Sequence, residues 1–271
     1  MTGKKVLYVS SEVIPYLPNN DISTLTYNLP KVVNKNGGQT RIFIPKYGLI
    51  NERRHQLHEV IRLSGMNLII DDLDMPLIIK VASIPKERMQ VYFIDNEEYF
   101  KNRLLESDKK KKLYKDNDER AIFFAKGVVE TIKKLNWSPD IIHVHGWIAS
   151  LMPLYLKEYY KDEPLFANSK VVTSIYENEI EGKLNSEIVN KIRFDEVENE
   201  TMKILEDSSY ENLYKISIMN SDGVIFASDK VKDSYLDIAK SLKIPTLNCG
   251  FKEGFEKEYT EFYNDKILNK Q

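Results

Sequence analysis

The chain has 271 residues, which is enough for one large α/β domain or two small ones. Its 41 acidic and 39 basic residues nearly balance, so we expect neither nucleic acid nor a membrane surface as a partner. The single cysteine, Cys249, excludes an internal disulfide, and no apolar run reaches transmembrane length, so we expect a soluble cytoplasmic protein.

Strand-like apolar runs alternate with helical patterns, which predicts a parallel sheet with crossover helices. The first strand is expected at 6–10. A helix should follow at about 22–36, with Asp21 or Ser23 as its N-cap and Gly37-Gly38 at its end. The later elements are expected, in chain order, as strands at 41–44 and 90–94, a short helix at 96–100, an amphipathic helix at 116–135, a strand at 140–145, a helix at 148–160, a strand at 170–175, a polar helical segment at 177–213, a strand at 223–227 and a helix at 229–242. This pattern is typical of a doubly wound, Rossmann-like α/β fold with a mostly parallel sheet.

Three segments do not follow this alternation. Residues 58–85 contain two or three strand-like runs with Gly65 and Asp71-Asp72 at the turns, which predicts an antiparallel β-hairpin inserted in the sheet. The charged, aromatic segment 251–271 is expected to be a helical tail that follows a main domain at 1–250. The charged run at 108–112 is expected to be a solvated surface loop.

The loop between the first strand and the first helix has no glycine. In α/β folds this turn brings a phosphate or a sugar to backbone N–H groups at a helix N-terminus. Here Pro15 and Pro18 lack that donor, and Asp21 puts a negative charge where an anionic ligand would bind. The sequence therefore leaves open whether this loop is a working site.

Two histidines alternate along the strand at 140–145, so His143 and His145 should face the same side of the sheet at its carboxyl end. Each is either a cleft residue that contacts a ligand or a hydrogen-bonded structural histidine, and the structural alternative is favoured for His143. No third ligand stands at metal spacing and no glycine-rich phosphate motif occurs, so we predict neither a metal nor a cofactor. Trp147 is either a platform for a sugar ring or part of the core, with the core favoured.

Six short segments, in order and at characteristic spacing, carry a family likeness. They are Val6–Tyr16 at the first strand, Leu29–Lys31 in the first helix, Arg41–Gly48 with a Pro-x-Tyr-Gly turn, Val91–Arg103 with Tyr-Phe-Ile-Asp-Asn, Asp116–Phe124 with Asp-Asn-x-Glu-Arg, and Asp140–Trp147 with Asp-Ile-Ile-His. Together they resemble the bacterial glycogen synthases and plant starch synthases over about residues 4–230.

The resemblance implies a GT-B glycosyltransferase fold, in which two Rossmann-like domains enclose a cleft. The family transfers glucose from ADP-glucose to the 4-OH at the non-reducing end of an α-1,4-glucan. This chain resembles the N-terminal, acceptor-side domain alone, and the C-terminal domain would bring the nucleotide site. The expected fold is therefore a single N-terminal half of a GT-B fold.

The departures from the family pattern gather at the cleft. The family's Lys-Thr-Gly-Gly-Leu loop is Pro18–Ile22 here, so its lysine and both glycines are absent. Gly146 and Ile148 replace an aspartate and a glucose-contacting histidine, and Tyr176 replaces a further histidine. No catalytic residue is predicted. The remaining candidates for cleft or glucan contacts are Glu12, Tyr16, Asn19, Asn20, Asp21, His145, Trp147, Tyr176 and Glu177.

These departures favour a glycogen/starch synthase homologue that is reduced to its acceptor-side domain and is weakly active or inactive alone. The alternatives are a non-catalytic glucan-binding or protein-interaction module in glycogen metabolism, or one half of a split glycosyltransferase. The expected partners are an α-glucan such as glycogen, ADP-glucose, or a protein partner or second copy over the interface that the other domain would cover. The sequence does not decide whether the chain is an enzyme.

Overall fold

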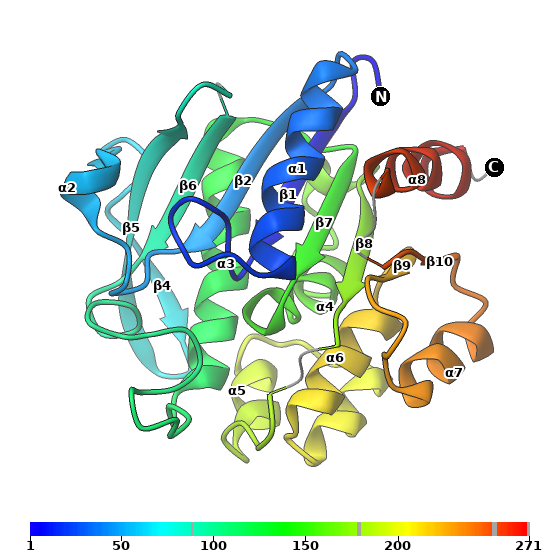
Figure 1. Cartoon of the computed structure of the whole chain (residues 1–271). Helices are drawn as coiled ribbons and strands as arrows, with labels where there is room; N and C mark the ends of the chain where they lie inside the picture. Colours follow the sequence, from blue (N-terminus) through cyan, green and yellow to red (C-terminus); the bar gives the residue numbers. More distant parts are fainter. Residues whose placement is uncertain (88, 178–179, 251–253, 270–271) are drawn as a thin grey trace.

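The computed structural model describes residues 1–87, 89–177, 180–250 and 254–269 (Figure 1). The strands are β1 (Lys5–Ser10), β2 (Gln39–Pro45), β3 (His58–Glu59), β4 (Met66–Ile70), β5 (Leu73–Ile84), β6 (Met89–Asp95), β7 (Ile141–His145), β8 (Lys170–Ile175), β9 (Gly223–Phe226) and β10 (Thr246–Asn248). The helices are α1 (Asp21–Lys35), α2 (Glu52–His55), α3 (Asn117–Leu135), α4 (Met152–Lys157), α5 (Ile188–Phe194), α6 (Tyr210–Met219), α7 (Asp233–Ser241) and α8 (Phe255–Phe262). Short 3-10 turns cover Trp147–Ala149, Pro164–Phe166 and Glu200–Glu206, and π-helical turns cover Tyr263–Leu268 directly after α8.

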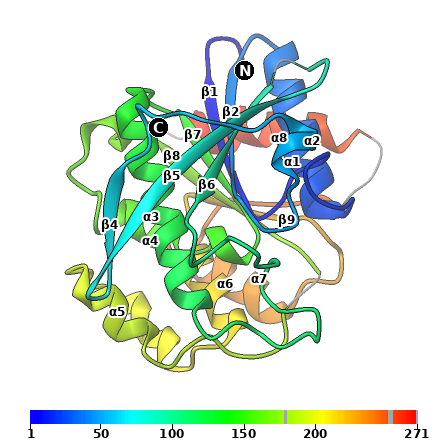
Figure 2. The same ribbon diagram turned by 90° about the vertical axis from the view of Figure 1, so that its left-hand side faces the viewer.

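The strands form a mixed sheet in the order β10-β9-β8-β7-β1-β2-β6-β5-β3, and β4 pairs with the first half of β5. The strands from β10 to β6 run parallel, whereas β5 is antiparallel to β6 and to β3. The predicted doubly wound, mostly parallel sheet is confirmed. So is the inserted hairpin, β4–β5, which runs alongside α3 (Figure 2). Because β1 lies between β2 and β7, the strand order reverses there, and such a switch point opens a crevice at the carboxyl ends of the strands.

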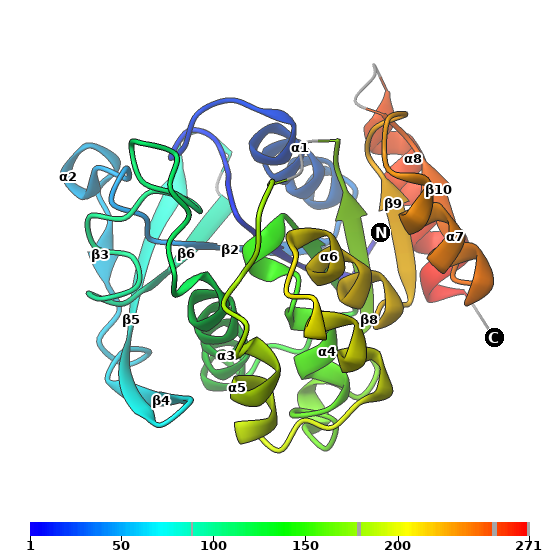
Figure 3. The ribbon, with the colours of Figure 1, turned by 90° about the horizontal axis from the view of Figure 1, so that it is seen from below.

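Helices cover both faces of the sheet. α1 and α8 lie on one face, and α3, α4 and α6 lie on the other (Figure 1 and Figure 3). The tail packs closely, because a side chain at Gly223 in β9 would lie 2.3 Å from Ile267 and 3.2 Å from Phe262. The predicted division into a main domain at 1–250 and a tail at 251–271 falls beside residues 251–253, which lie outside the described part, so this division stays a prediction.

Local sequence explains the elements that flank the cleft. Val6, Leu7, Tyr8 and Val9 of β1 are fully buried, as a central parallel strand requires. The predicted apolar face of α3 is confirmed, because Ile122, Phe123, Ala125, Val129 and Ile132 are all buried. α1 starts one residue earlier than expected: its N-cap is Asn20, not Asp21 or Ser23. It ends ahead of Gly37, whose φ of +79° turns the chain back toward β2.

One predicted helix is wrong and another is shorter than predicted. Residues 96–100 form a turn, because the Asn96 side-chain oxygen accepts the N–H groups of Glu98 and Tyr99 and so competes with a helical first turn. The stretch at 148–160 is a 3-10 turn followed by α4, because proline at position 153 is tolerated only in the first turn of a helix.

In two further regions the sequence did not predict the individual helices and strands. The polar segment at 177–213 contains α5, a 3-10 turn and the start of α6, while residues 178 and 179 lie outside the described part. β10 was not predicted, because a strand of three residues is too short to show a period.

Candidate functional site

A cleft of about 660 Å³ opens at the carboxyl ends of β1 and β7, the edge of the sheet that faces the viewer in Figure 3. Five of the predicted site residues line it, namely Glu12, Asn20, Asp21, Trp147 and Tyr176. They come from the segment between β1 and α1 and from the loops after β7 and β8. This cleft is therefore the main candidate site, since open α/β sheets bind their ligands at the switch point.

Glu12 is the most buried carboxylate of the cleft. Its residue surface is 6% exposed, and its Oε2 accepts a hydrogen bond from Asn20 Nδ2 at 2.7 Å. Burial raises the pKa of Glu12 to about 7; the bond from Asn20 opposes this rise and the charge of Glu106 adds to it. Glu12 therefore changes protonation near neutral pH and can either donate or accept a hydrogen bond there.

The amino-terminal end of α1 is closed by the protein's own groups. Asn20 Oδ1 accepts the N–H of Ser23 at 2.8 Å, and Ser23 Oγ accepts the N–H of Asn20 at 2.9 Å, which completes a capping box. Asp21 then places a carboxylate in the first helical turn. A helix end that is capped and negatively charged in this way is a poor site for a phosphate.

Trp147 lines the cleft, but its ring is packed in the protein and only 3% of the residue is exposed. The Arg120 guanidinium lies over the ring at 5.6 Å, and the Tyr210 ring meets it edge-on at 5.8 Å. These contacts make the indole part of the core rather than an open stacking platform. Its Nε1–H is buried and has no partner among the described residues.

His143 and His145 lie beneath the cleft and are fully buried, with ring centroids 3.9 Å apart. His143 Nδ1 is 2.5 Å from the Tyr263 hydroxyl of the tail, and its Nε2 is 2.8 Å from Ser174 Oγ. His145 Nδ1 is 2.6 Å from the Tyr176 hydroxyl. Burial lowers the pKa of both rings, that of His145 to about 3, so both are neutral. The structure therefore connects His145 to the cleft through Tyr176 and does not place it in the lining.

The comparison with known proteins identifies the fold's relatives. The family model for the starch synthase catalytic domain matches residues 5–241. The chain belongs to this family. Among curated relatives, the glycogen synthase of Chlorobium luteolum is 36% identical over 237 residues, which cover 86% of this chain and 47% of that protein. The glycogen synthase of Chlorobaculum tepidum is 37% identical over 235 residues, with 86% and 47% covered.

A solved structure supports the fold. The catalytic domain of starch synthase IV from Arabidopsis thaliana, bound to ADP and acarbose, superimposes with a TM-score of 0.75 at 16% sequence identity, covering 92% of this chain and 52% of that one. The predicted likeness to one half of a GT-B starch synthase is confirmed at the level of the fold. The chain spans about half the length of the curated relatives it matches, 47% in both cases given above.

Gly146 stands where the family pattern has an aspartate, and no side chain fits there. Its φ is +81°, and a Cβ at this position would lie 2.3 Å from Ser11 Oγ and 2.9 Å from Ser11 Cβ. Ser11 is 1% exposed, and its Oγ has no partner among the described residues. Ser11 therefore occupies the space that a side chain at position 146 would need.

We expect Gly146→Ala to lower the free energy of unfolding by about 2 kcal/mol, because the left-handed backbone and the overlap with Ser11 both disfavour a Cβ. The Ser11→Gly substitution removes the overlapping atoms. In a protein that carries it, Gly146→Ala should lower the free energy of unfolding by only about 1 kcal/mol, the cost of the left-handed backbone alone. Urea unfolding of the wild type, both single variants and the double variant measures the coupling. Equal losses in the two backgrounds would contradict the steric role of Ser11.

The other predicted candidates lie outside the cleft lining. Tyr16 is buried edge-on against Phe93, with ring centroids 4.9 Å apart. Asn19 accepts a hydrogen bond from a threonine of α1 and is exposed. Glu177 lines a separate hollow of about 420 Å³ that shares Asp21 with the cleft, and its carboxylate pairs with Lys230 at 3.4 Å.

The sequence analysis missed the loop between β6 and α3. Its residues Leu105, Glu106, Ser107, Lys111 and Leu113 line the cleft. The charged run at 108–112 is largely solvent-exposed, as expected, but Lys111 also borders the site. Only the uninterrupted lysines pointed to this loop, because the side-chain hydrogen bonds that hold it, such as that from Arg120 to the Leu104 carbonyl, leave no periodic pattern in the sequence.

The chemistry of the cleft suits a ligand rich in hydroxyl groups. Carboxylates at positions 12, 21, 106 and 181 line the cleft and can accept hydrogen bonds. In the described residues, no group of three or more His, Cys, Asp or Glu side chains is placed to hold a metal ion. The same part of the chain contains no helix that is long and apolar enough to cross a membrane.

Proposed function

We propose that this chain binds the end of an α-glucan in the cleft and does not transfer glucose by itself. The observation that carries the proposal is the start of α1, where Asn20 caps the helix and Asp21 adds a negative charge. The family's activity requires a site for the diphosphate of a nucleotide sugar, and this end of the helix does not offer one. The remaining cleft still has the hydrogen-bonding groups that a sugar requires.

The size and lining of the cleft support sugar binding. A volume of about 660 Å³ falls within the usual range for small-molecule sites. The carboxylates of Glu12 and Glu106 can accept sugar hydroxyls, while Ser11 Oγ and Trp147 Nε1 are buried donors without partners in the described structure.

The loss of diphosphate donors explains why transfer is not expected. Each missing donor at such a site costs on the order of 3 kcal/mol of transition-state stabilisation. Two such losses alone lower the rate by about 10⁴-fold.

We expect the purified protein to co-sediment with glycogen and to incorporate no labelled glucose from ADP-glucose. Glu106→Gln replaces a charged acceptor with a neutral one and should weaken glycogen binding about fivefold. Asp72→Asn, the same change in kind on the exposed β4–β5 turn, is the matched control and should leave binding unchanged. Glucose incorporation would overturn the inactive part of the proposal, and an absence of co-sedimentation would overturn the binding part.

The half-length match favours a second candidate, in which this chain is one part of a complete transferase. The other half would come from further sequence or from a separate polypeptide, and a protein partner or a second copy would then cover the surface it leaves exposed. Mixing the protein with the isolated C-terminal half of the Chlorobium luteolum enzyme tests this candidate: glucose transfer by the mixture would favour it over the first. For both candidate functions we propose a cytoplasmic location, because a single cysteine is typical of proteins in a reducing compartment.

A further inference from the structure

A second hollow, of about 550 Å³, lies between the β4–β5 hairpin and the ends of α4 and α5, and it is called here the hairpin hollow. It shares no lining residue with the cleft. One wall is β4, the outer strand of the hairpin (Figure 2). The lining consists of residues 66–69 of β4, Lys126 and Glu130 of α3, Tyr159 and Tyr160 after α4, and residues 194–196 at the end of α5.

The edge of β4 that faces away from β5 has no strand partner in the described part of the chain. The two-residue turn of the hairpin makes Ile70 and Leu73 a hydrogen-bonded pair, and such pairs alternate with non-bonded ones along an antiparallel ladder. The backbone groups of Asn67 and Ile69 therefore point away from β5. The Ile69 carbonyl agrees with this, because it accepts a hydrogen bond from Lys126 Nζ at 2.7 Å. No other described group bonds to the N–H of either residue.

The sequence does not protect this open edge. Proteins commonly block such an edge with a charged residue or a proline, whereas β4 reads Met-Asn-Leu-Ile-Ile. Seven large apolar side chains are exposed among the described residues, and three of them line the hollow: Ile69 at 52%, Tyr159 at 43% and Phe194 at 52%. An open strand edge beside exposed apolar side chains is typical of a surface that binds another polypeptide.

The hairpin hollow has an excess of negative charge. Its one lining lysine, Lys126, is 3% exposed and pairs with Asp195 Oδ1 at 2.5 Å. Glu130 has a lysine neighbour at 3.1 Å, while Glu196 is exposed and has no ion pair in the described structure. Burial raises the pKa of Tyr159, and the charges of these three carboxylates add to the rise. The hollow therefore favours a positively charged partner.

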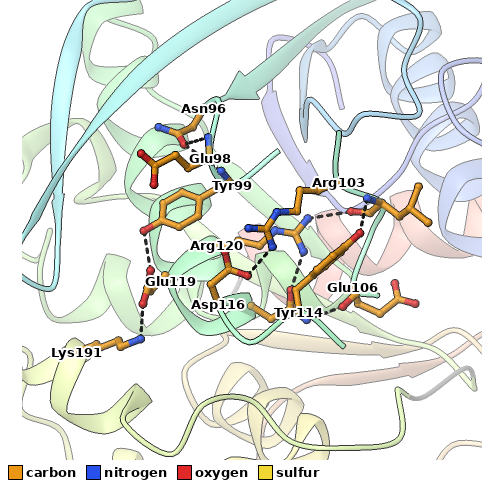
Figure 4. A network of polar contacts seen from close by, with 12 residues as sticks. Asn96, Glu98, Tyr99, Arg103, Glu106, Tyr114, Asp116, Glu119, Arg120 and Lys191 are labelled. Atoms are coloured by element: carbon orange, nitrogen blue, oxygen red, sulfur yellow. Dashed lines mark hydrogen bonds and ion pairs between the residues drawn. The ribbon is translucent and has the colours of Figure 1, made fainter. Parts of the chain in front are cut away.

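Buried contacts fix the far wall of the hollow. Asp195 Oδ2 accepts a hydrogen bond from the Tyr155 hydroxyl of α4 at 2.7 Å. One helical turn earlier in α5, Lys191 pairs with Glu119 of α3 at 2.5 Å (Figure 4) and with Asp118 at 2.8 Å. α5 is thus tied to its neighbours at two points. A surface that is held in place before its partner arrives loses little conformational entropy on binding.

We propose that the open edge of β4 and the hairpin hollow bind an extended, positively charged segment of a partner protein. The backbone of this segment adds a strand to the hairpin by pairing with Asn67 and Ile69. Its apolar side chains cover Tyr159 and Phe194, and its basic side chains meet Glu196 at the rim. This surface is separate from the cleft, so the proposal goes beyond the proposed function and does not depend on it.

Charge also distinguishes this partner from a second copy of the chain. Two copies that paired along β4 would bring two negatively charged hollows together, and juxtaposed like charges disfavour association. A basic segment gains the same backbone hydrogen bonds and adds attraction. The structure therefore favours a different polypeptide over self-association.

Fluorescence polarisation with the 271-residue protein and synthetic peptides tests the proposal. The probe is labelled Gly-Val-Lys-Phe-Lys-Val-Gly, whose alternation suits a strand, and its counterpart has glutamate in place of each lysine. At low salt we expect the basic peptide to bind at least about tenfold more tightly than the acidic one. This advantage should shrink in about 0.5 M salt, because the carboxylate of Glu196 is exposed.

Two variants of Asn67 test the backbone pairing. Asn67→Pro removes an N–H that the added strand would use, and proline is tolerated on an open sheet edge. It should lower the affinity for the basic peptide about tenfold, whereas Asn67→Ala should leave it unchanged. Thermal unfolding of both variants checks that they fold. Slower amide exchange at Ile69 when the peptide binds the wild type gives a second readout that requires no variant.

The side-chain contacts are tested separately. Glu196→Gln should lower the affinity for the basic peptide about threefold, and Phe194→Ala should lower it about fivefold. Glu98→Gln, on the loop after β6, and Leu242→Ala, at the end of α7, make the same changes at exposed positions outside the hollow. These two matched controls should bind the peptide as the wild type does.

Several results would overturn the proposal. These are equal binding of the two peptides, no binding of the basic peptide at about 1 mM, or unchanged binding by Asn67→Pro. In sedimentation velocity, a dimer that dissociates in Asn67→Pro would assign the edge to a second copy instead. Maltoheptaose binding that is lost in Phe194→Ala, without any peptide binding, would assign the hollow to a glucan and also overturn the proposal.

Discussion

Replacing Tyr263 with alanine is expected to destabilise the protein by about 3–5 kcal/mol, because a fully buried aromatic side chain is lost from a packed interface. The Tyr263 ring meets the His143 ring edge-on at 5.7 Å, and its hydroxyl is 2.5 Å from His143 Nδ1. This residue therefore fixes the tail against the centre of the sheet. Its removal also leaves a buried imidazole nitrogen without a partner, which places the loss in the upper part of the range.

Tyr263→Phe separates the hydrogen bond from the packing. It keeps the ring and removes the hydroxyl, so we expect a smaller loss of about 1–3 kcal/mol. Glu261→Ala, at an exposed position of the same helix, is the control and should stay within about 0.5 kcal/mol of the wild type. Urea unfolding at neutral pH measures all three. A Tyr263→Ala variant as stable as Glu261→Ala would show that the tail does not stabilise the sheet.

The contact between Tyr263 and His143 is connected to the cleft through other buried side chains. The His143 ring contacts the His145 ring at a tilt of 44°, and His145 Nδ1 bonds to the hydroxyl of Tyr176, a lining residue. One chain of buried contacts thus runs from the tail to the ligand side of β8. We expect Tyr263→Ala to affect the cleft through this chain, whereas Glu261→Ala should not.

The fold could be predicted because its signals are local. The apolar run of β1 and the single apolar face of α3 depend on residues close together in the sequence, and a parallel sheet follows from their alternation. The errors arose where a side chain competes with the backbone or where proline sets a boundary. Asn96 turned an expected helix into a turn, and Pro153 divided another.

The sequence predicted those residues of the candidate site that come directly after a strand of the parallel sheet. Glu12 and Trp147 come directly after β1 and β7, so their place at the switch point follows from the topology. Tyr16 follows the same strand but turns into the core beside Phe93, which no pattern reveals. Lys111 lies on a loop that the buried Arg120 holds through the Leu104 carbonyl, and a side-chain contact of this kind leaves no periodic signal in the sequence.

Glu12→Gln is expected to stabilise the protein at alkaline pH by roughly 3 kcal/mol relative to the wild type. The pKa of Glu12 is about 7 in the folded state, against an ordinary value of 4.5, and burial is the main cause. The folded state therefore holds a proton that the unfolded state releases between these values. The contribution of Glu12 to stability is complete below pH 4.5, falls as the pH rises and is lost above pH 7. Glutamine keeps the acceptor for Asn20 Nδ2 and removes the buried charge.

The measurement is the difference in unfolding free energy between Glu12→Gln and the wild type, followed from pH 5 to pH 8. This difference should grow by roughly 2–3 kcal/mol toward pH 8. The depressed pKa values of His143 and His145 act in the opposite direction at acid pH, but they are common to both proteins and cancel. Glu181→Gln, the same change at an exposed carboxylate of the same cleft, is the matched control. A flat difference for Glu12→Gln would mean that Glu12 is ionised at little cost, and the cleft would then already be hydrated enough to solvate a charge without a ligand.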